Sequence, residues 1–140
     1  MEHGYIKIKE NGAGHFVVDA KLVNGDHWMT QHEIADLFNV VASSVGNTIR
    51  AIFKSEILRE ENVTQIHKFT LNGKTNEVLL YNLEAIIHIG FRVCSFEAKI
   101  FREWVVKGFS EYQKIEKMQF SKVLIMLSCD SRTPLFTSLN

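Results

Sequence analysis

Residues able to hydrogen-bond to DNA lie close together between positions 41 and 54. An asparagine amide makes paired hydrogen bonds to an adenine edge, an arginine forks onto guanine or clamps a phosphate, and serine hydroxyls suit phosphate oxygens. These types follow one another here at intervals of three and four residues, which places them on one side of a helix. The pattern therefore predicts a DNA-binding surface made of Ser43, Ser44, Asn47, Arg50 and Lys54.

Three further residues on that side lack hydrogen-bonding side chains: Val41, Ala42 and Gly46. Ala42 suits contact with a thymine methyl group, and Gly46 allows close approach of the backbone. A glycine weakens a helix by about 1 kcal/mol relative to alanine, so something must compensate for Gly46. Close docking against a ligand and a packing contact within the fold both explain it.

A helix-turn-helix is the element that would position these residues. Its two helices share one core, so each needs apolar residues at helical spacing, and the first needs a small residue where they cross. Ala35 is that small residue. The apolar positions of the two helices are Ile34, Leu37, Phe38, Val45 and Ile49.

Capping residues fall where the two helices must begin. Thr30 with Glu33 forms a capping box for the first helix, and Ser43 or Ser44 is expected to cap the second. Asn39 suits the left-handed residue of the tight turn. The competing interpretation is a helical hairpin inside some other fold.

Flanking segments predict an α+β fold: a winged helix-turn-helix-like core with an N-terminal β-hairpin, a second β-hairpin and C-terminal helices. Asn72-Gly73 between apolar runs is the strongest hairpin signal, and Trp28 is expected to anchor the first hairpin to the helical core. The predicted domain spans residues 1–120, followed by a tail of uncertain order at 121–140. Within the domain we expect a hairpin at 5–23, the helix-turn-helix at 30–54, a hairpin at 64–81, and helices at 82–90 and 96–119.

Net charge is zero, with sixteen basic and sixteen acidic residues, whereas many nucleic-acid binders are basic. Residues 1–64 carry six basic against nine acidic residues, a net of minus three, and residues 65–140 carry ten against seven, a net of plus three. If the second hairpin is a wing, Lys74 at its tip would reach a minor groove or the DNA backbone. A purely structural hairpin is the alternative. An ordinary solvated surface and a row of phosphate contacts explain the later cations equally well: Lys68, Lys74, Arg92, Lys99, Arg102 and Lys107.

The last helix carries an apolar stripe. We expect its first half to pack in the core and its second half to contact a second copy, because one recognition helix offers few base contacts and a homodimer would read a two-fold site. The stripe consists of Phe101, Trp104, Val105, Gly108, Tyr112 and Ile115.

Enzyme chemistry finds little support. The six histidines show no HExxH spacing, and the two cysteines, Cys94 and Cys129, lie far apart. No Walker-type phosphate loop occurs. We therefore expect no catalytic residues, no metal and no cofactor, and, without an apolar leader or a membrane-length apolar run, a soluble cytoplasmic protein.

Four segments together resemble the RhuM family of bacterial DNA-binding, virulence-associated proteins. They are WMTQHEIADLF, NTIRAIF, YNLEAIIHIGFRV and FREWV, within roughly residues 14–108, and related pieces occur in phage antirepressor and BRO-N or KilA-N type domains. The resemblance implies a helix-turn-helix protein of prophages or other mobile elements, without established catalytic activity. It implies that Ser43, Ser44, Asn47 and Arg50 face DNA. The resemblance also implies that the family's structural signature consists of Tyr81, Asn82, Arg92, Phe101 and Trp104.

Two function classes follow from the sequence. The first is a transcriptional regulator or accessory factor of a mobile element that binds double-stranded DNA. The alternative is a non-enzymatic protein-interaction module that uses the C-terminal helix, which the neutral net charge favours.

Overall fold

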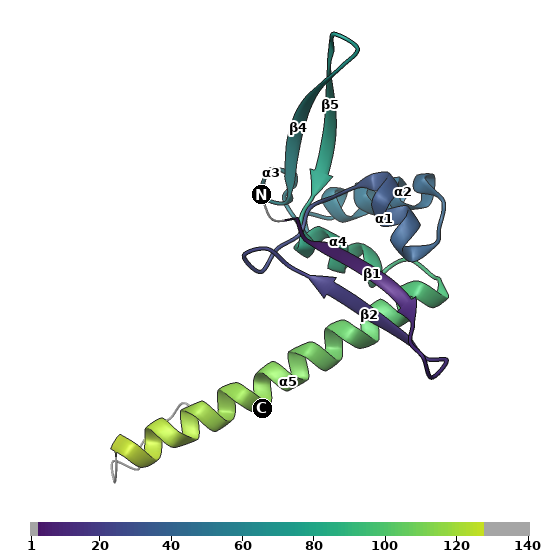
Figure 1. Ribbon diagram of the computed structural model, residues 1–140. Helices are drawn as coiled ribbons and strands as arrows, with labels where there is room; N and C mark the ends of the chain where they lie inside the picture. The colour runs from purple at the N-terminus through teal and green to yellow at the C-terminus, as the bar shows by residue number, and fades with distance from the viewer. Residues whose placement is uncertain (1–2, 128–140) are drawn as a thin grey trace. The chain divides into compact units, whose positions relative to one another are not determined.

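The computed structural model describes residues 3–127, with side chains described through residue 119. Two antiparallel sheets and five helices make up this part of the chain, which is α+β as predicted (Figure 1). The elements are β1 (Tyr5–Glu10), β2 (Phe16–Lys21), β3 (Met29–Thr30), α1 (Gln31–Phe38), α2 (Ala42–Lys54), α3 (Glu60–Val63), β4 (Thr64–Leu71), β5 (Lys74–Tyr81), α4 (Leu83–Gly90) and α5 (Phe96–Leu127).

The turn between α1 and α2 forms as the sequence predicts. Thr30 accepts a hydrogen bond from the Glu33 backbone N–H at 3.1 Å, and the Glu33 carboxylate accepts one from the Thr30 backbone N–H at 2.9 Å. Asn39 ends α1 in the left-handed region, with φ 53° and ψ 49°. The capping box and the turn residue are therefore both confirmed.

The predicted cap of α2 is wrong. The N-cap is Val41, which makes no side-chain cap hydrogen bond, and Ser43 and Ser44 already lie inside the helix. Gln31 Nε2 donates to the Ala42 carbonyl oxygen at 2.7 Å and ties the first turn of α2 to α1. This bond fixes the position of the helix start, but it does not replace a cap, because a cap accepts from the free N–H groups of the first turn.

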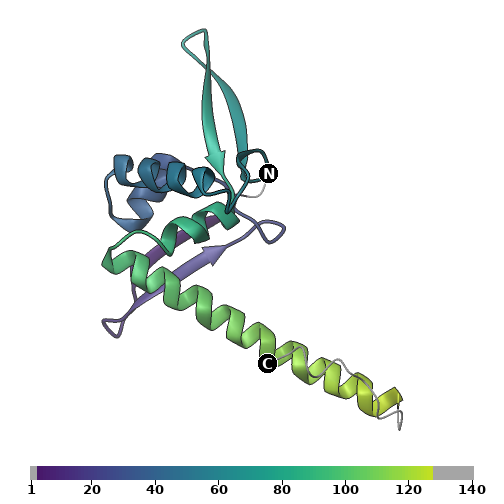
Figure 2. The same cartoon turned by 180° about the vertical axis from the view of Figure 1, so that it is seen from behind.

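One apolar core joins the helices to the first hairpin. α2 packs against both α1 and α4, and β1 packs against α1, so these elements lie together in one body (Figures 1 and 2). Burial of apolar surface stabilises a fold by about 25 cal/mol per Å², so this core is the main source of the stability of the first unit. The most buried side chains are Ile34, Phe38, Val45, Ile52, Val63, Ile86, Ile89 and Phe101.

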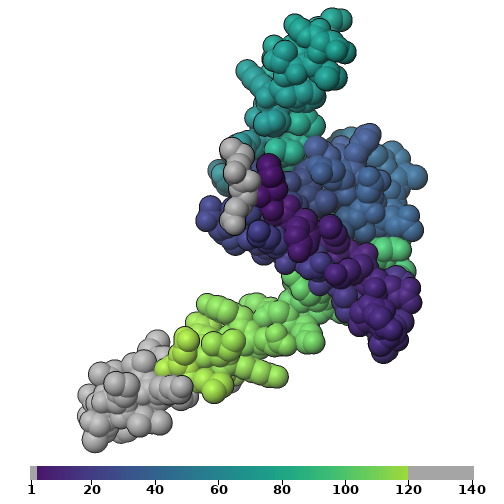
Figure 3. Space-filling view, viewed as in Figure 1, coloured from purple at the N-terminus to yellow at the C-terminus, as the bar shows by residue number. Residues whose placement is uncertain are grey.

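Both predicted hairpins are present. β1 pairs with β2, and β4 pairs with β5 through a two-residue turn in which Asn72 and Gly73 both have positive φ, 53° and 74°. Positive φ at both positions gives the turn that matches strand twist. The hairpin of β4 and β5, which we call the wing, projects beyond the helices (Figure 3).

The wing is tied to the helix pair by a third strand. β3 directly precedes α1 and pairs with the end of β5, Met29 opposite Tyr81. Met29 is buried, whereas Trp28 is only half-buried, so Met29 takes the anchoring position that we assigned to Trp28. Side chains alternate along a strand, and the register of β3 turns Met29 rather than its neighbour inward.

The C-terminal helices differ from the prediction in length. Asn82 caps α4 as expected, accepting from the Ala85 backbone N–H at 3.1 Å. α5 runs on to Leu127, so its end extends into the predicted tail, of which residues 128–140 lie outside the described part. The chain divides into two compact units, Met1–Val105 and Val106–Asn140.

The two halves of the α5 stripe differ in burial as predicted. Phe101 is fully buried, and Trp104 and Val105 pack partly against the core, whereas Tyr112 and Ile115 are exposed. Among the described residues no helix combines the length and apolar character needed to cross a membrane.

Candidate nucleic-acid interface

One face of α2 is polar and solvent-exposed. Ser43, Asn47, Arg50 and Lys54 are all exposed and follow one another at intervals of four, three and four residues, which aligns them along the helix. We call these four residues the polar stripe. The opposite face is buried through Val45, Ile49 and Ile52.

Ser44, which the sequence also assigned to the DNA-binding surface, lies at the margin of this stripe. Its side chain is only half exposed, and its carbonyl oxygen accepts a hydrogen bond from Thr48 Oγ1 at 2.9 Å. Ser43 is the more accessible of the two hydroxyls. The helix therefore brings together four of the five residues assigned to it.

Asn47 and Arg50 are linked to each other. Arg50 Nη2 donates a hydrogen bond to Asn47 Oδ1. The bond aligns the guanidinium with the amide, and it leaves the remaining N–H groups of both side chains available as donors. The centre of the polar stripe is therefore rich in donors, which suits phosphate oxygens and the acceptor edge of guanine.

Arg50 also acts at the base of the wing. Tyr81 is buried there, and burial raises the pKa of its phenol, an effect that Glu60 reinforces and the positive charge of Arg50 opposes. Glu60 and Arg50 are therefore the charged side chains that act on the buried phenol of Tyr81, with opposite signs.

Gly46 has a packing role. It is buried, and a Cβ built on it would lie 2.8 Å from Gln31 Nε2. This resolves the two explanations left open by the sequence in favour of the contact within the fold. Ala42 is half-buried and packs against the core, so neither residue belongs to the exposed stripe.

The other predicted cations are distributed unevenly. Lys74 is exposed at the start of β5, beside the turn, and Lys68 forms an ion pair with Glu77 at 3.7 Å across the wing. Arg102 faces inward: its Nη1 donates to the carbonyl oxygens of Gly90 at 2.8 Å and Val93 at 3.1 Å. Nη1 of Arg102 therefore closes the turn that follows α4, and this use of the side chain favours a structural role over a phosphate contact.

The wing presents aromatic and apolar side chains that sequence reasoning left unassigned. Phe69 and Leu71 are exposed, by 41% and 59%, and the rings of His67 and Phe69 stack with centroids 6.4 Å apart. Alternate residues of β4 share a face, so positions 67, 69 and 71 align. The spacing of two residues between positions 67, 69 and 71 is the feature of the sequence that could have predicted this shared face.

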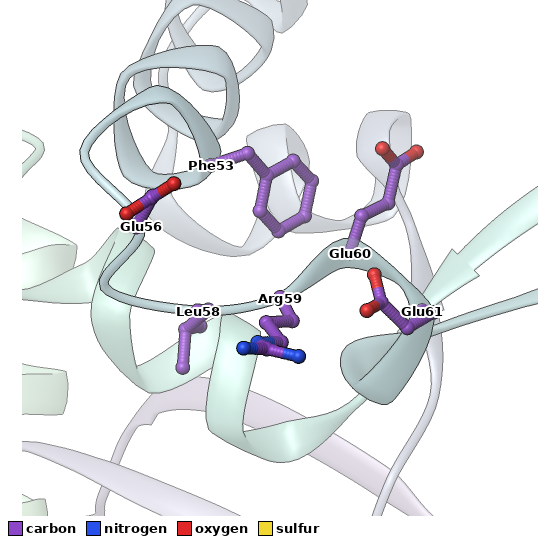
Figure 4. Close-up of a pocket in the computed structure, with 6 residues that line it drawn as sticks. All are labelled: Phe53, Glu56, Leu58, Arg59, Glu60 and Glu61. Carbon is purple, nitrogen blue, oxygen red and sulfur yellow. The ribbon is translucent and has the colours of Figure 1, made fainter.

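A cavity of about 420 Å³ lies beyond the C-terminal end of α2 (Figure 4). Phe53 and Leu58 supply its apolar wall. Its charged side chains are those of Glu56, Arg59, Glu60 and Glu61, which sum to a net negative charge. Phosphates would be repelled from this end, so the electrostatics favour the N-terminal three-quarters of the polar stripe over Lys54.

Within residues 3–127, no group of three or more histidine, cysteine, aspartate or glutamate side chains is arranged to hold a metal ion. Comparisons with protein-family models, with curated proteins and with solved structures found no match. The resemblance to the RhuM family stays a prediction from the sequence motifs.

Proposed function

We propose that this protein binds double-stranded DNA by inserting α2 into the major groove, and that it acts as a transcriptional regulator or accessory factor. The observation that carries the proposal is the polar stripe. One face of α2 is fixed to a core by Val45 and Ile49, while the other offers Ser43, Asn47 and Arg50 to solvent. A recognition helix needs this division between a buried and a base-reading face.

The order of the elements supports the same function. α1 and α2 are joined by a tight turn at Asn39, and the wing follows α2 in the chain. We propose that this is a winged helix-turn-helix, in which Lys74 at the wing tip contacts the DNA backbone or minor groove. RhuM-family membership, and with it a role on a bacterial mobile element, belongs to the same proposal.

The distribution of charge limits how the protein binds. The chain has no net charge, and the carboxylates of Glu56, Glu60 and Glu61 line the cavity that follows the C-terminal end of α2. Long-range attraction to DNA is therefore weak, and binding rests on a few local contacts. We accordingly expect a shallow dependence of affinity on salt compared with a strongly basic protein.

Fluorescence anisotropy of a labelled random-sequence duplex tests the proposal. The wild type, Arg50→Ala and Arg59→Ala are titrated at low and near-physiological salt. Both variants remove one exposed arginine, but only Arg50 belongs to the polar stripe. Arg50→Ala should weaken binding and lower the slope of log affinity against log salt by about one, because a phosphate contact is lost.

Arg59→Ala should bind as tightly as the wild type or slightly more weakly, without the change in slope. Absence of binding at low salt, or equal losses in the two variants, would contradict the proposal. Circular dichroism of each variant checks that the fold is intact. Asn47→Ala provides a second substitution within the stripe and should also weaken binding.

A protein-interaction module is the second candidate. The T-shaped pair of Phe16 and Phe96, with ring centroids 5.0 Å apart, favours it because both rings are about half exposed. Exposed aromatic side chains are typical of protein interfaces. This candidate predicts a folded protein that binds no duplex at low salt, so the anisotropy titration separates the two.

A further inference from the structure

The part of α5 in the second unit exposes an unusual number of large apolar side chains. We call residues 106–119 the α5 segment. Within it Val106, Phe109, Tyr112, Ile115 and Met118 are exposed by 54%, 63%, 60%, 55% and 62%. Phe109, Tyr112 and Ile115 lie on one side of the helix, and Val106 and Met118 lie away from that side. An exposed apolar stripe of this kind marks an interaction site.

Two of these residues, Tyr112 and Ile115, continue a repeat that begins in the core, whereas Val106, Phe109 and Met118 lie outside that repeat. Ala98, Val105 and Tyr112 are seven residues apart, and so are Phe101, Gly108 and Ile115. The two series alternate at intervals of three and four residues, which is the spacing of the inward positions of a coiled coil. Ala98 and Phe101 are fully buried and Val105 is half-buried, while the later positions are open to solvent.

Gly108 gives a separate indication of close approach. It lies inside a helix, where glycine is unfavourable, and a Cβ built on it would meet no atom within 4 Å. Nothing in the described structure therefore requires a glycine there. On the inward side of a paired helix, a glycine lets the neighbouring backbone come near and leaves room for a large side chain such as Tyr112.

We propose that the α5 segment pairs with the same segment of a second copy of this chain. A helix without a partner is marginal in water unless it packs its apolar face. The repeat is the pattern by which helices associate with their own kind. The polar residues also allow self-association, since Lys107, Glu111, Lys114, Glu116 and Lys117 mix both signs, three against two.

Because both signs are mixed, the α5 segments of two copies do not repel each other. The mixed charges also do not favour a different protein of strong net charge. The inference concerns the second unit and is independent of DNA binding by the first. A homodimer would nevertheless supply two recognition helices per assembly. Failure of one proposal leaves the other testable, because dimer formation is measured without DNA.

Analytical ultracentrifugation of the full chain, from low to high micromolar concentration, tests the pairing. Tyr112→Glu adds a charge to the repeat, and Ser110→Glu adds the same charge to the polar side of the same helix. The wild type and Ser110→Glu should form dimers, and Tyr112→Glu should be monomeric at concentrations where the wild type is dimeric. Ile115→Glu is a second variant and should behave like Tyr112→Glu.

Thermal melting of the first unit should be unchanged in all three variants, since the substituted residues lie outside it. A wild type that stays monomeric at every concentration would overturn the proposal. So would a dimer that survives both Tyr112→Glu and Ile115→Glu, because its interface would then lie elsewhere.

Discussion

Substitution of Gly90 by alanine tests how tightly α4 packs in the core. A Cβ at this position would lie 2.8 Å from Phe101 Cδ2, 3.0 Å from Phe101 Cε2 and 3.0 Å from Phe38 Cζ. Both rings are fully buried, and they pack edge to face with centroids 5.1 Å apart. The new methyl group would therefore meet two rigid neighbours at once.

The expected magnitude follows from two opposing terms. Forcing an extra carbon into a well-packed core costs about 1 to 3 kcal/mol. Replacing a helical glycine by alanine gains about 0.5 to 1 kcal/mol. Because the rings of Phe38 and Phe101 cannot move apart without disturbing other core residues, packing outweighs propensity. Taking the middle of each range, Gly90→Ala should lower the free energy of unfolding by about 1 kcal/mol.

Gly46→Ala is the matched control. Gly46 is also a buried helical glycine, and its nearest neighbour is likewise 2.8 Å from a built Cβ, but that neighbour is the flexible end of Gln31. Moving this amide sacrifices one hydrogen bond, worth about 0.5 to 1.5 kcal/mol. The gain in helix propensity is similar, so the two nearly cancel.

Urea unfolding followed by circular dichroism measures both variants against the wild type. The predicted order of stability places Gly46→Ala near the wild type and Gly90→Ala clearly below it. A Gly90→Ala protein as stable as the wild type, or equal losses in the two variants, would refute the reasoning that the rigidity of the neighbour decides the cost.

Two further predictions concern the first unit. Ile34→Ala should cost about 2 to 5 kcal/mol in the same urea assay, because Ile34 is fully buried, and Trp104→Ala should cost less because its ring is partly exposed; equal losses would contradict this ranking. Burial lowers the pKa of His27 below its usual 6.5, against the raising effect of Glu33 and Asp26. The unfolded chain then takes up the proton at higher pH than the folded one, so the free energy of unfolding should fall as the pH drops through about 6.5 and level off below the folded pKa. His27→Gln should remove this part of the pH dependence, and identical pH profiles of the two proteins would show that His27 does not contribute it.

Elements specified by neighbouring residues could be predicted from the sequence. The capping box of Thr30 and Glu33 involves residues three apart, and Asn39 and Asn72 tolerate positive φ through their own side chains. Each of these signals acts within one turn of the chain. The helix pair and the wing were therefore expected in the right places.

Elements specified by distant residues could not be predicted. The hydrogen bond from Gln31 to the Ala42 carbonyl oxygen joins α2 to the preceding helix, and the close packing at Gly46 involves the same side chain. The inward direction of Arg102 depends on the carbonyl oxygens of Gly90 and Val93. Sequence spacing shows that such residues share a face, but it does not show which atoms cover that face.

The candidate site was predicted in part for the same reason. Spacing alone placed Ser43, Asn47 and Arg50 on one side of α2, and all three are exposed there. The hydrogen bond between Asn47 and Arg50 and the carboxylates around the cavity beyond α2 required the folded chain. Because of these two features, we expect the DNA contacts of α2 to come mainly from hydrogen-bond donors in the first part of that helix.

The most direct test of the proposed DNA-binding surface is an NMR titration of the isotope-labelled protein with duplex DNA, following backbone amide shifts residue by residue. We predict that the first and largest changes fall in α2, at Ser43, Asn47 and Arg50, with smaller changes at the wing tip around Lys74. Changes confined to the first hairpin or to α5, or no changes at low salt, would contradict it.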